Sequence, residues 1–483
     1  MERRSWNSVR LVNALLLLVV AVAGAGGCEQ LTNPVSVPGE AGDRLAAQAG
    51  AASGDAANDR AALMALYDAT DGDNWTDNTN WGSDEDLADW YGVATYQGRV
   101  VEVILEDNGL SGELPAELGD LDQLEWLLLR HNADLSGGIP AELGNLGSLT
   151  WLALENSALS GKIPAELGNL SSLEVLSIIN TSVSGSIPPE LGNLSSLVAL
   201  DLRQNDMSGG IPPELGNLSS LDILYIIDNG MSGSIPPELG NLSSLRWMAL
   251  MRNSLSGEIP SELGHIGGLE HLFLDDNQLS GGVPSSLGNL AALERLHLQR
   301  NRFTGALPGT FLNLYLAENE FSWWSNRGLC IPNTEAFRAW MTRMGYADWA
   351  VNRSLCSADR EALLGLHDAL GGENWADSNW GDDADIRTWR GVTLDSDVRV
   401  TELRLGSSGL SGEIPDLLAD LDMLEVLVLE GNGLVGEIPE AVMDLELDVF
   451  WWSDNPGLCV PDTDAFRTWL TDMRSASGPI CGR

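Results

Sequence analysis

The segment IPPELGNLSSL occurs three times in this chain, at residues 187–197, 211–221 and 235–245. The copies start 24 residues apart, and one proline in each repeat extends this period to most of the chain. These prolines are Pro115, Pro140, Pro164, Pro188, Pro212, Pro236, Pro260, Pro284 and Pro308, followed later by Pro415 and Pro439. A fixed period of this length indicates a solenoid, because one such unit cannot bury its apolar face without its neighbours.

Each unit follows the pattern LxxLxxLxLxxNxLSGxIP. Its alternating part predicts a short strand in which Leu224 and Ile226 point inward while Tyr225 points outward. A polar side chain at the N of this pattern would form hydrogen bonds with the backbone of adjacent turns. Without them, buried backbone N–H and C=O groups would remain unpaired. The residues expected there are Asn108, Asn132, Ser157, Thr181, Asn205, Asn229, Asn253, Asn277, Asn301 and Asn319.

This unit resembles the plant-type leucine-rich repeat of receptor-like kinase ectodomains, because it carries the LSGxIP segment. The resemblance covers most of the chain and implies an α/β solenoid. In that fold a right-handed superhelix has a parallel β-sheet on its concave face and 3-10 or irregular segments on its convex side. No kinase domain or membrane-spanning helix follows the repeats, so the receptor role of the plant proteins is not carried over.

Two similar passages predict two separate modules. DRAALMALYDATDGDNW at residues 59–75 and DREALLGLHDALGGENW at residues 359–375 resemble the N-terminal cap of plant-type arrays. The cysteines usual in that cap are absent, so we expect tryptophan packing to hold it. The long module spans 59–356 (cap 59–98, repeats 99–322, C-terminal cap 323–356), with about ten strands, the last at Leu314 and Leu316. The short module spans 359–483 (cap 359–397, repeats 398–450, C-terminal cap 451–483), with about three strands near Leu403, Leu427 and Leu447, and we expect it to be less stable.

The first 27 residues predict a signal peptide, since Arg3, Arg4 and Arg10 precede an apolar run that ends near Ala25. Gly27 and Cys28 resemble the end of a bacterial lipobox, although alanine stands where leucine is usual. This implies an exported cell-envelope or cell-surface protein that contacts the membrane only through a lipid on Cys28. Ordinary cleavage and secretion is the alternative. Residues 28–58 are expected to form a flexible tether.

The other four cysteines form two similar pairs: the first cysteine of each pair ends the segment NRGLC (Cys330) or NPGLC (Cys459), and a second cysteine follows 26 or 22 residues later. They predict the disulfides Cys330–Cys356 and Cys459–Cys481, which suit an exported protein. A metal site is the competing interpretation, but no CxxC motif or nearby histidine pair accompanies these cysteines.

The chain of 483 residues has a formal charge of -44, from 70 acidic and 26 basic residues. Such a charge disfavours nucleic acid and anionic lipid headgroups as partners. No nucleophile elbow, phosphate loop, zinc signature or acid-base dyad occurs, so we expect no enzyme activity, no cofactor and no metal. His271 and His297, beside Asp275 and Asp276, lack a clear third ligand and are interpreted as surface residues.

Large aromatic residues occupy outward positions of the predicted sheet, where they suit recognition of a protein, peptide or glycan. The predicted contact residues are Trp126, Trp151, Tyr225, Trp247, Phe273 and Tyr315. In the alternative interpretation these side chains pack on one another and stabilise the sheet. The favoured hypothesis is a non-catalytic extracytoplasmic recognition or adhesion protein. Two others remain: a structural surface spacer without a ligand, and, by analogy with plant inhibitors of this repeat class, a regulator of extracellular hydrolases.

Overall fold

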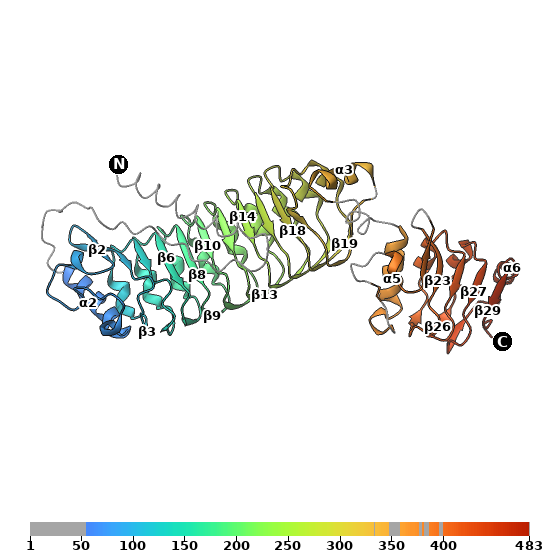
Figure 1. Cartoon of the computed structure of the whole chain (residues 1–483), viewed down its shortest axis with the longest axis horizontal. Coiled ribbons are helices and arrows are strands. Elements are labelled where there is room, and N and C mark those ends of the chain that lie inside the picture. The colour runs from blue at the N-terminus through green and yellow to red at the C-terminus, as the bar shows by residue number, and fades with distance from the viewer. Residues whose placement is uncertain are drawn as a thin grey trace.

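The computed structural model describes residues 55–332, 334–346, 358–375, 379–380, 386–395 and 399–482. The predicted signal peptide, most of the tether and Cys28 lie outside this range. The first described element is helix α2 (Asp55–Ala69), which begins four residues before the predicted cap. From α2 onward, short strands stack in chain order along a solenoid, up to helix α3 (Glu335–Arg343) (Figure 1).

The strand at each LxL segment joins one sheet of 11 strands. In spatial order these are β1 (Val93–Tyr96), β2 (Arg99–Ile104), β4 (Trp126–Leu128), β6 (Trp151–Glu155), β8 (Val175–Ile179), β10 (Ala199–Asp201), β12 (Ile223–Tyr225), β14 (Trp247–Ala249), β16 (His271–Phe273), β18 (Arg295–His297) and β20 (Phe321–Ser322). All pairs are parallel except β1 with β2. Equivalent residues face each other, as Leu200 faces Leu224, so the 24-residue period fixes the register.

A second sheet, of 8 strands, forms at the LSG segments, for which the sequence analysis predicted no strand. Its strands in spatial order are β21 (Asn326–Cys330), β19 (Asn301–Ala306), β17 (Gln278–Gly282), β15 (Ser254–Gly257), β13 (Gly230–Gly233), β11 (Asp206–Gly209), β9 (Ser182–Gly185) and β7 (Ser160–Gly161). The pair β3 (Gly112–Glu113) and β5 (Leu135–Ser136) forms a separate two-stranded sheet. Parallel stacking of identical units brings these short segments together as well.

A 3-10 helix follows the proline of each repeat. These helices are η3 (Ala116–Asp120), η4 (Ala141–Asn145), η5 (Ala165–Asn169), η6 (Pro189–Asn193), η7 (Pro213–Asn217), η8 (Pro237–Asn241), η9 (Ser261–His265), η10 (Ser285–Asn289) and η11 (Gly309–Asn313). Their glycines allow close stacking: a Cβ on Gly216 would lie 2.3 Å from the carbonyl oxygen of Glu238 in the next repeat. The expectation of 3-10 segments opposite the main sheet is therefore confirmed.

The interior of the solenoid is one continuous apolar core from Ala62 to Met344, to which each repeat contributes its leucines. Asparagine side chains link successive turns by hydrogen bonds to the backbone, which form a ladder along the solenoid. Asn253 Nδ2 donates to the carbonyl oxygens of Ile226 (2.6 Å) and Leu250 (3.1 Å), and its Oδ1 accepts from the amide of Met231 (3.1 Å). The ladder satisfies backbone groups that the core excludes from water.

The end of the long module differs from the prediction. Leu314 follows η11 as Leu290 follows η10, and the last strand comes later, at Phe321. The predicted strand position is wrong because one more residue separates Pro308 from Phe321 than separates Pro284 from Leu296 in the preceding repeat. Asn326, not Asn319, completes the asparagine ladder, with Nδ2 donating to the carbonyl oxygen of Leu298 at 3.0 Å.

The N-terminal cap packs tryptophans as predicted. Trp81 contacts both Trp75 (ring centroids 4.8 Å apart) and Trp90 (5.0 Å). The sequence interpretation missed an ion pair: the fully buried Asp59 accepts hydrogen bonds from Arg99 Nε (3.0 Å) and from the amide of Val100 (2.8 Å). This pair attaches helix α2 to strand β2.

The short module has its own apolar core, between Ala362 and Phe466. Its α-helices are α5 (Ala358–Ala369) and α6 (Asp464–Thr471). One sheet contains β22 (Val392–Leu394), β23 (Val400–Arg404), β25 (Val426–Val428), β27 (Val449–Trp451) and β29 (Ser475–Ser477). A second sheet contains β24 (Ser411–Glu413), β26 (Gly433–Glu437) and β28 (Gly457–Cys459). The third repeat strand centres on Phe450 rather than on Leu447, because this repeat is one residue shorter. Asp359 repeats the cap bond by accepting from Arg399 Nε at 3.0 Å.

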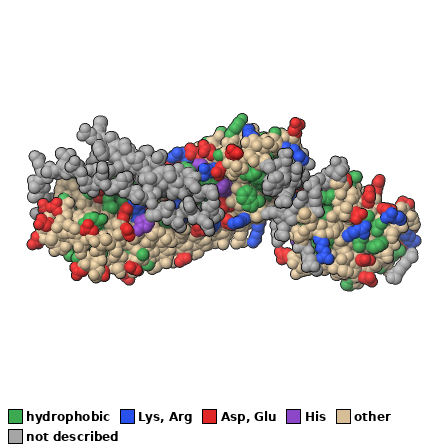
Figure 2. Space-filling model, viewed as in Figure 1, with side chains coloured by type: hydrophobic (Ala, Val, Ile, Leu, Met, Phe, Trp, Pro, Cys, Tyr) green, Lys and Arg blue, Asp and Glu red, His purple; other side chains and the backbone are tan. Residues whose placement is uncertain are grey.

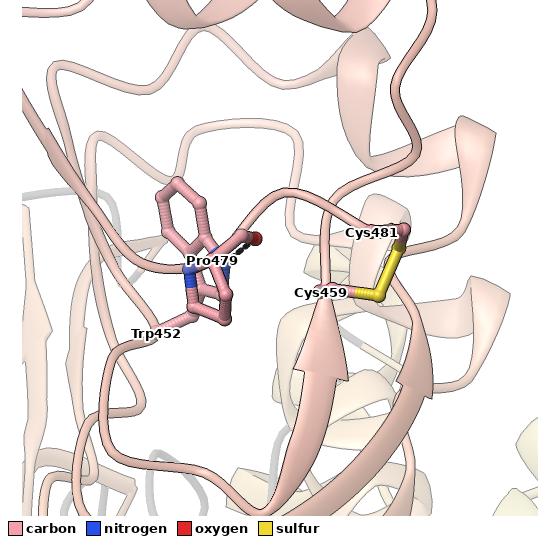
Figure 3. Close-up of a disulfide and its surroundings, with 4 residues drawn as sticks. All are labelled: Trp452, Cys459, Pro479 and Cys481. Atoms are coloured by element: carbon pink, nitrogen blue, oxygen red, sulfur yellow. Dashed lines mark hydrogen bonds between the residues drawn. A yellow bond between two sulfur atoms is a disulfide. The ribbon is translucent and has the colours of Figure 1, made fainter. Parts of the chain in front are cut away.

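Cys459 and Cys481 form the predicted disulfide, with Cα atoms 5.1 Å apart (Figure 3). Beside it, Trp452 Nε1 donates to the carbonyl oxygen of Pro479 at 3.0 Å, so the C-terminal segment is held by two kinds of contact. Cys330 is also disulfide-bonded. Its predicted partner, Cys356, lies outside the described residues.

Candidate functional site

The outward residues of the 11-stranded sheet form an apolar cluster that is separate from the interior core. We call it the apolar strip. Its members are Leu128, Trp151, Ala153, Val175, Ala199, Ile223, Tyr225, Ile227, Trp247, Ala249 and Phe273, with Ile104, Trp126 and Met251 packed against them. Because equivalent positions are in register, the strip runs across the strands from β4 to β16.

Aromatic side chains within the strip contact one another. Trp126 and Trp151 pack edge to face with centroids 5.5 Å apart, and the ring of His271 lies against Trp247. The guanidinium of Arg203 lies 5.6 Å from the ring centre of Tyr225. Sideways packing of the aromatic residues, the alternative considered from the sequence, is thus present alongside their outward orientation.

The sequence interpretation expected accessible contact residues. In the full-length chain Trp151, Tyr225, Trp247 and Phe273 are buried and Trp126 is half-buried. Part of this burial comes from side chains on adjacent strands, which lie about 4.8 Å apart and cover one another.

The predicted position of Tyr315 is wrong. This residue follows η11 outside the sheet, is 75% exposed, and packs against the guanidinium of Arg343 at 4.6 Å. It does not join the other five predicted contact residues.

Ion pairs between successive repeats border the strip. Beyond the C-terminal ends of the strands, Arg130 pairs with Glu106 (2.5 Å), Arg252 with Asp228 (3.1 Å) and Arg300 with Asp276 (3.2 Å). Before the strands, Arg246 pairs with Asp222 at 2.5 Å. An apolar centre with a charged border is the usual arrangement of a binding surface.

Polar atoms inside the strip lack partners among the described residues. The Nε1 atoms of Trp151 and Trp247 and the hydroxyl of Tyr225 are buried without a hydrogen bond. Burial raises the pKa of the Tyr225 phenol. It also raises the pKa of Asp201 to about 6, although Arg203 pairs with that carboxylate at 2.9 Å. An unpaired buried polar group costs about 1 to 3 kcal/mol, which a ligand hydrogen bond would offset.

His271 and His297 lie on the neighbouring strands β16 and β18, and Asp275 follows β16. His271 is buried, so the expectation that it is a surface residue is wrong. Burial lowers the pKa of each histidine to about 4 and raises the pKa of Asp275 to about 6. The histidines are therefore neutral at neutral pH. Within the described ranges no group of three or more His, Cys, Asp or Glu residues is placed to hold a metal ion.

Comparisons with known proteins agree with this geometry. A leucine-rich repeat region model matches residues 105–210, and a leucine-rich repeat model matches 268–290 and 292–314. The structure is similar to the leucine-rich repeat ectodomain of the plant membrane receptor kinase GASSHO1/SCHENGEN3 from Arabidopsis thaliana, in complex with CASPARIAN STRIP INTEGRITY FACTOR 2. That match has a TM-score of 0.53 and 27% identity, and covers 87% of this chain and 47% of the receptor. This chain is a plant-type leucine-rich repeat protein.

Two other solved structures are similar to this leucine-rich repeat protein. The plant peptide hormone receptor RGFR1 in complex with RGF2 has a TM-score of 0.46 and 29% identity, over 79% of this chain and 55% of the receptor. A plant ice-binding protein has a TM-score of 0.48 and 29% identity, over 57% of this chain and 88% of the ice-binding protein. The chain spans about half the length of the two receptor ectodomains. No curated protein sequence matches it.

The visible surface of this leucine-rich repeat protein carries many acidic side chains on its described part (Figure 2). Among the helices that the structure describes, none has both the length and the apolar character needed to cross a bilayer. The main site residue that the sequence interpretation missed is Trp324, which is 47% exposed and opposes Gln299 at the end of the sheet. Because one extra residue follows Pro308, the 24-residue period did not place Trp324 opposite Gln299 in the sequence analysis.

Proposed function

We propose that this protein is a non-catalytic, exported recognition protein that captures an extended peptide, or an extended segment of a protein, on the apolar strip. The observation that carries the proposal is the strip itself: a continuous outward-facing apolar row, separate from the core, whose buried indole N–H groups have no partner among the residues that the structure describes. Aromatic residues with one polar atom are the side chains that dominate protein interfaces.

The dimensions of the strip support a peptide. Strands β4 to β16 extend it over about 29 Å, since neighbouring strands lie about 4.8 Å apart. An extended chain advances about 3.3 Å per residue, so about nine residues would lie along the strip. Carbonyl oxygens of such a chain would accept hydrogen bonds from the buried indoles of Trp151 and Trp247. The similar Arabidopsis receptor ectodomain is also in complex with a partner.

Export and anchoring belong to the same proposal. The charged and apolar segments of residues 1–27 and the Gly27–Cys28 pair support translocation followed by lipidation. Intact-mass measurement of the protein produced from its full coding sequence tests this part. A mass that corresponds to a chain starting at an acylated Cys28 is expected, whereas a retained leader would contradict export by this route.

Replacement of Trp126, Trp151 and Trp247 together with alanine tests the binding surface. Selection of a phage-displayed random peptide library on the purified protein should enrich peptides on the wild type and not on the triple variant. Equal enrichment on both would refute the assignment. Tyr315→Ala removes an exposed aromatic residue outside the sheet and should behave as the wild type. Circular dichroism of each variant checks that the fold is retained.

A further inference from the structure

The C-terminal end of the apolar strip brings three chemically complementary side chains into line. Asp275, Gln299 and Trp324 occupy equivalent positions beyond strands β16, β18 and β20. Their register follows from backbone bonds: the amide of Asp276 donates to Gln299 O at 3.1 Å, and the amide of Arg300 donates to Trp324 O at 2.9 Å. The three side chains therefore lie side by side, on strands about 4.8 Å apart.

Asp275 forms no ion pair with a described residue, although Arg252 and Arg300 lie close enough to favour its charged form. It is 7% exposed, and its Oδ1 atom is buried without a hydrogen bond. The nearby arginines are engaged elsewhere, Arg252 with Asp228 at 3.1 Å and Arg300 with Asp276 at 3.2 Å. A buried carboxylate that lacks a paired cation is costly, so this residue favours a ligand that supplies one.

The two neighbours of Asp275 also suit a cation. Gln299 Oε1 is a buried acceptor that receives no hydrogen bond from the described part of the chain, and Trp324 presents a partly exposed indole. An aromatic face attracts ammonium and guanidinium groups, and an amide oxygen can accept one of their N–H bonds. A carboxylate, an amide oxygen and an indole on adjacent strands together form a receptor for an organic cation.

We propose that Asp275, Gln299 and Trp324 bind the Lys or Arg side chain of an extended peptide whose other residues lie along the apolar strip. This inference rests on the proposed function and specifies its ligand: a basic peptide. The whole molecule favours such a ligand, because its formal charge of -44 attracts cationic peptides over long distances.

The experiment selects the phage-displayed random peptide library on four proteins: wild type, Asp275→Asn, Trp324→Ala and Asp206→Asn. Asp206→Asn makes the same change of charge at an exposed residue of the second sheet, in β11, and is the matched control. Peptides enriched on the wild type and on the control should contain Lys or Arg at a common position. Asp275→Asn should lose this preference and keep the apolar positions of the enriched sequences.

A selected peptide and its Lys/Arg→Gln counterpart then give a quantitative test by fluorescence anisotropy. The exchange to Gln should weaken binding to the wild type at least about tenfold and leave binding to Asp275→Asn nearly unchanged, which shows that the two groups are coupled. Trp324→Ala should weaken binding of the basic peptide about threefold to tenfold.

The outcomes separate the two proposals. Enriched peptides without a basic residue, or a basic preference that persists in Asp275→Asn, would overturn the cation site and leave peptide capture on the strip intact. If the wild type enriches no peptides beyond those on the triple tryptophan variant, both the proposed function and this inference are overturned. Thermal unfolding of each variant shows whether a loss of binding reflects loss of fold.

Discussion

Single residues hold this solenoid together where the repeat pattern alone would leave a charge or a clash. Asp59 is fully buried, yet its carboxylate accepts hydrogen bonds from Arg99 and from the amide of Val100, so its charge is both paired and hydrogen-bonded. The partnership with Asp59 raises the pKa of the Arg99 guanidinium further above its ordinary value. Asp359 and Arg399 repeat the arrangement in the short module.

Asp59→Ala should destabilise the long module by about 3 kcal/mol, because it leaves a partly buried guanidinium and the Val100 amide without their acceptor. Asp122 also pairs with Arg99, but its side chain is 61% exposed. Asp122→Ala should therefore cost less than about 1 kcal/mol. Urea unfolding followed by tryptophan fluorescence measures both; equal losses would contradict the importance assigned to the buried pair.

Gly216→Ala tests the close stacking of the 3-10 helices. The new Cβ would lie 2.3 Å from the Glu238 carbonyl oxygen, so the neighbouring turn must shift, at a cost of about 1 to 3 kcal/mol. Gly267 has nothing within 4 Å of the position of a Cβ. Gly267→Ala should change the free energy of unfolding by no more than about 0.5 kcal/mol. Thermal melts of the two variants would show indistinguishable midpoints if stacking did not require Gly216.

At the level of elements, the asparagine ladder explains how neighbouring turns stay in register. Each amide joins the carbonyl groups of two turns, and it does so again in the short module at Asn432 and Asn455. Thr181 replaces part of this network, since its hydroxyl accepts from the amide of Val183 at 3.2 Å. Ser157 does not: its hydroxyl is buried without a hydrogen bond among the described residues. The ladder of side-chain hydrogen bonds is therefore interrupted at Ser157.

Asn253→Ala should lower the stability of the long module by about 2 to 4 kcal/mol, because it leaves the carbonyl of Ile226 and the amide of Met231 unsatisfied. Asn241 is a suitable control, since it is an exposed asparagine of the same repeat family in η8. Asn241→Ala should be nearly neutral. Hydrogen exchange should also show faster opening around β12 and β14 in Asn253→Ala only, and uniform exchange rates would argue against a local role.

For the whole molecule, two separate apolar cores predict two unfolding events. The long module stacks many repeats around one core, whereas the short module has few repeats and ends at the Cys459–Cys481 disulfide. Stability in such arrays rises with the number of stacked neighbours, so the short module should unfold first.

Replacement of Cys459 and Cys481 with serine should lower only the earlier transition in differential scanning calorimetry. The disulfide closes a loop of 22 residues, so its loss should cost about 3 kcal/mol. The later transition of the long module serves as the internal control. A single transition that moves as a whole would show instead that the modules unfold together.

The sequence alone determined the solenoid, the strand register, the inward leucines and one disulfide of the short module, because a 24-residue period repeats the same local physics in every turn. It could not locate Phe321 and Phe450, since a single inserted or deleted residue breaks the period at the last repeat of each module. The second sheet and the Asp59–Arg99 pair arise only when segments far apart in the chain meet. The candidate site is divided in the same way: the sequence supplied five of its aromatic side chains and a period that places Asp275 beside Gln299, whereas only the tertiary structure places Trp324 next to Gln299, because one extra residue after Pro308 breaks the period.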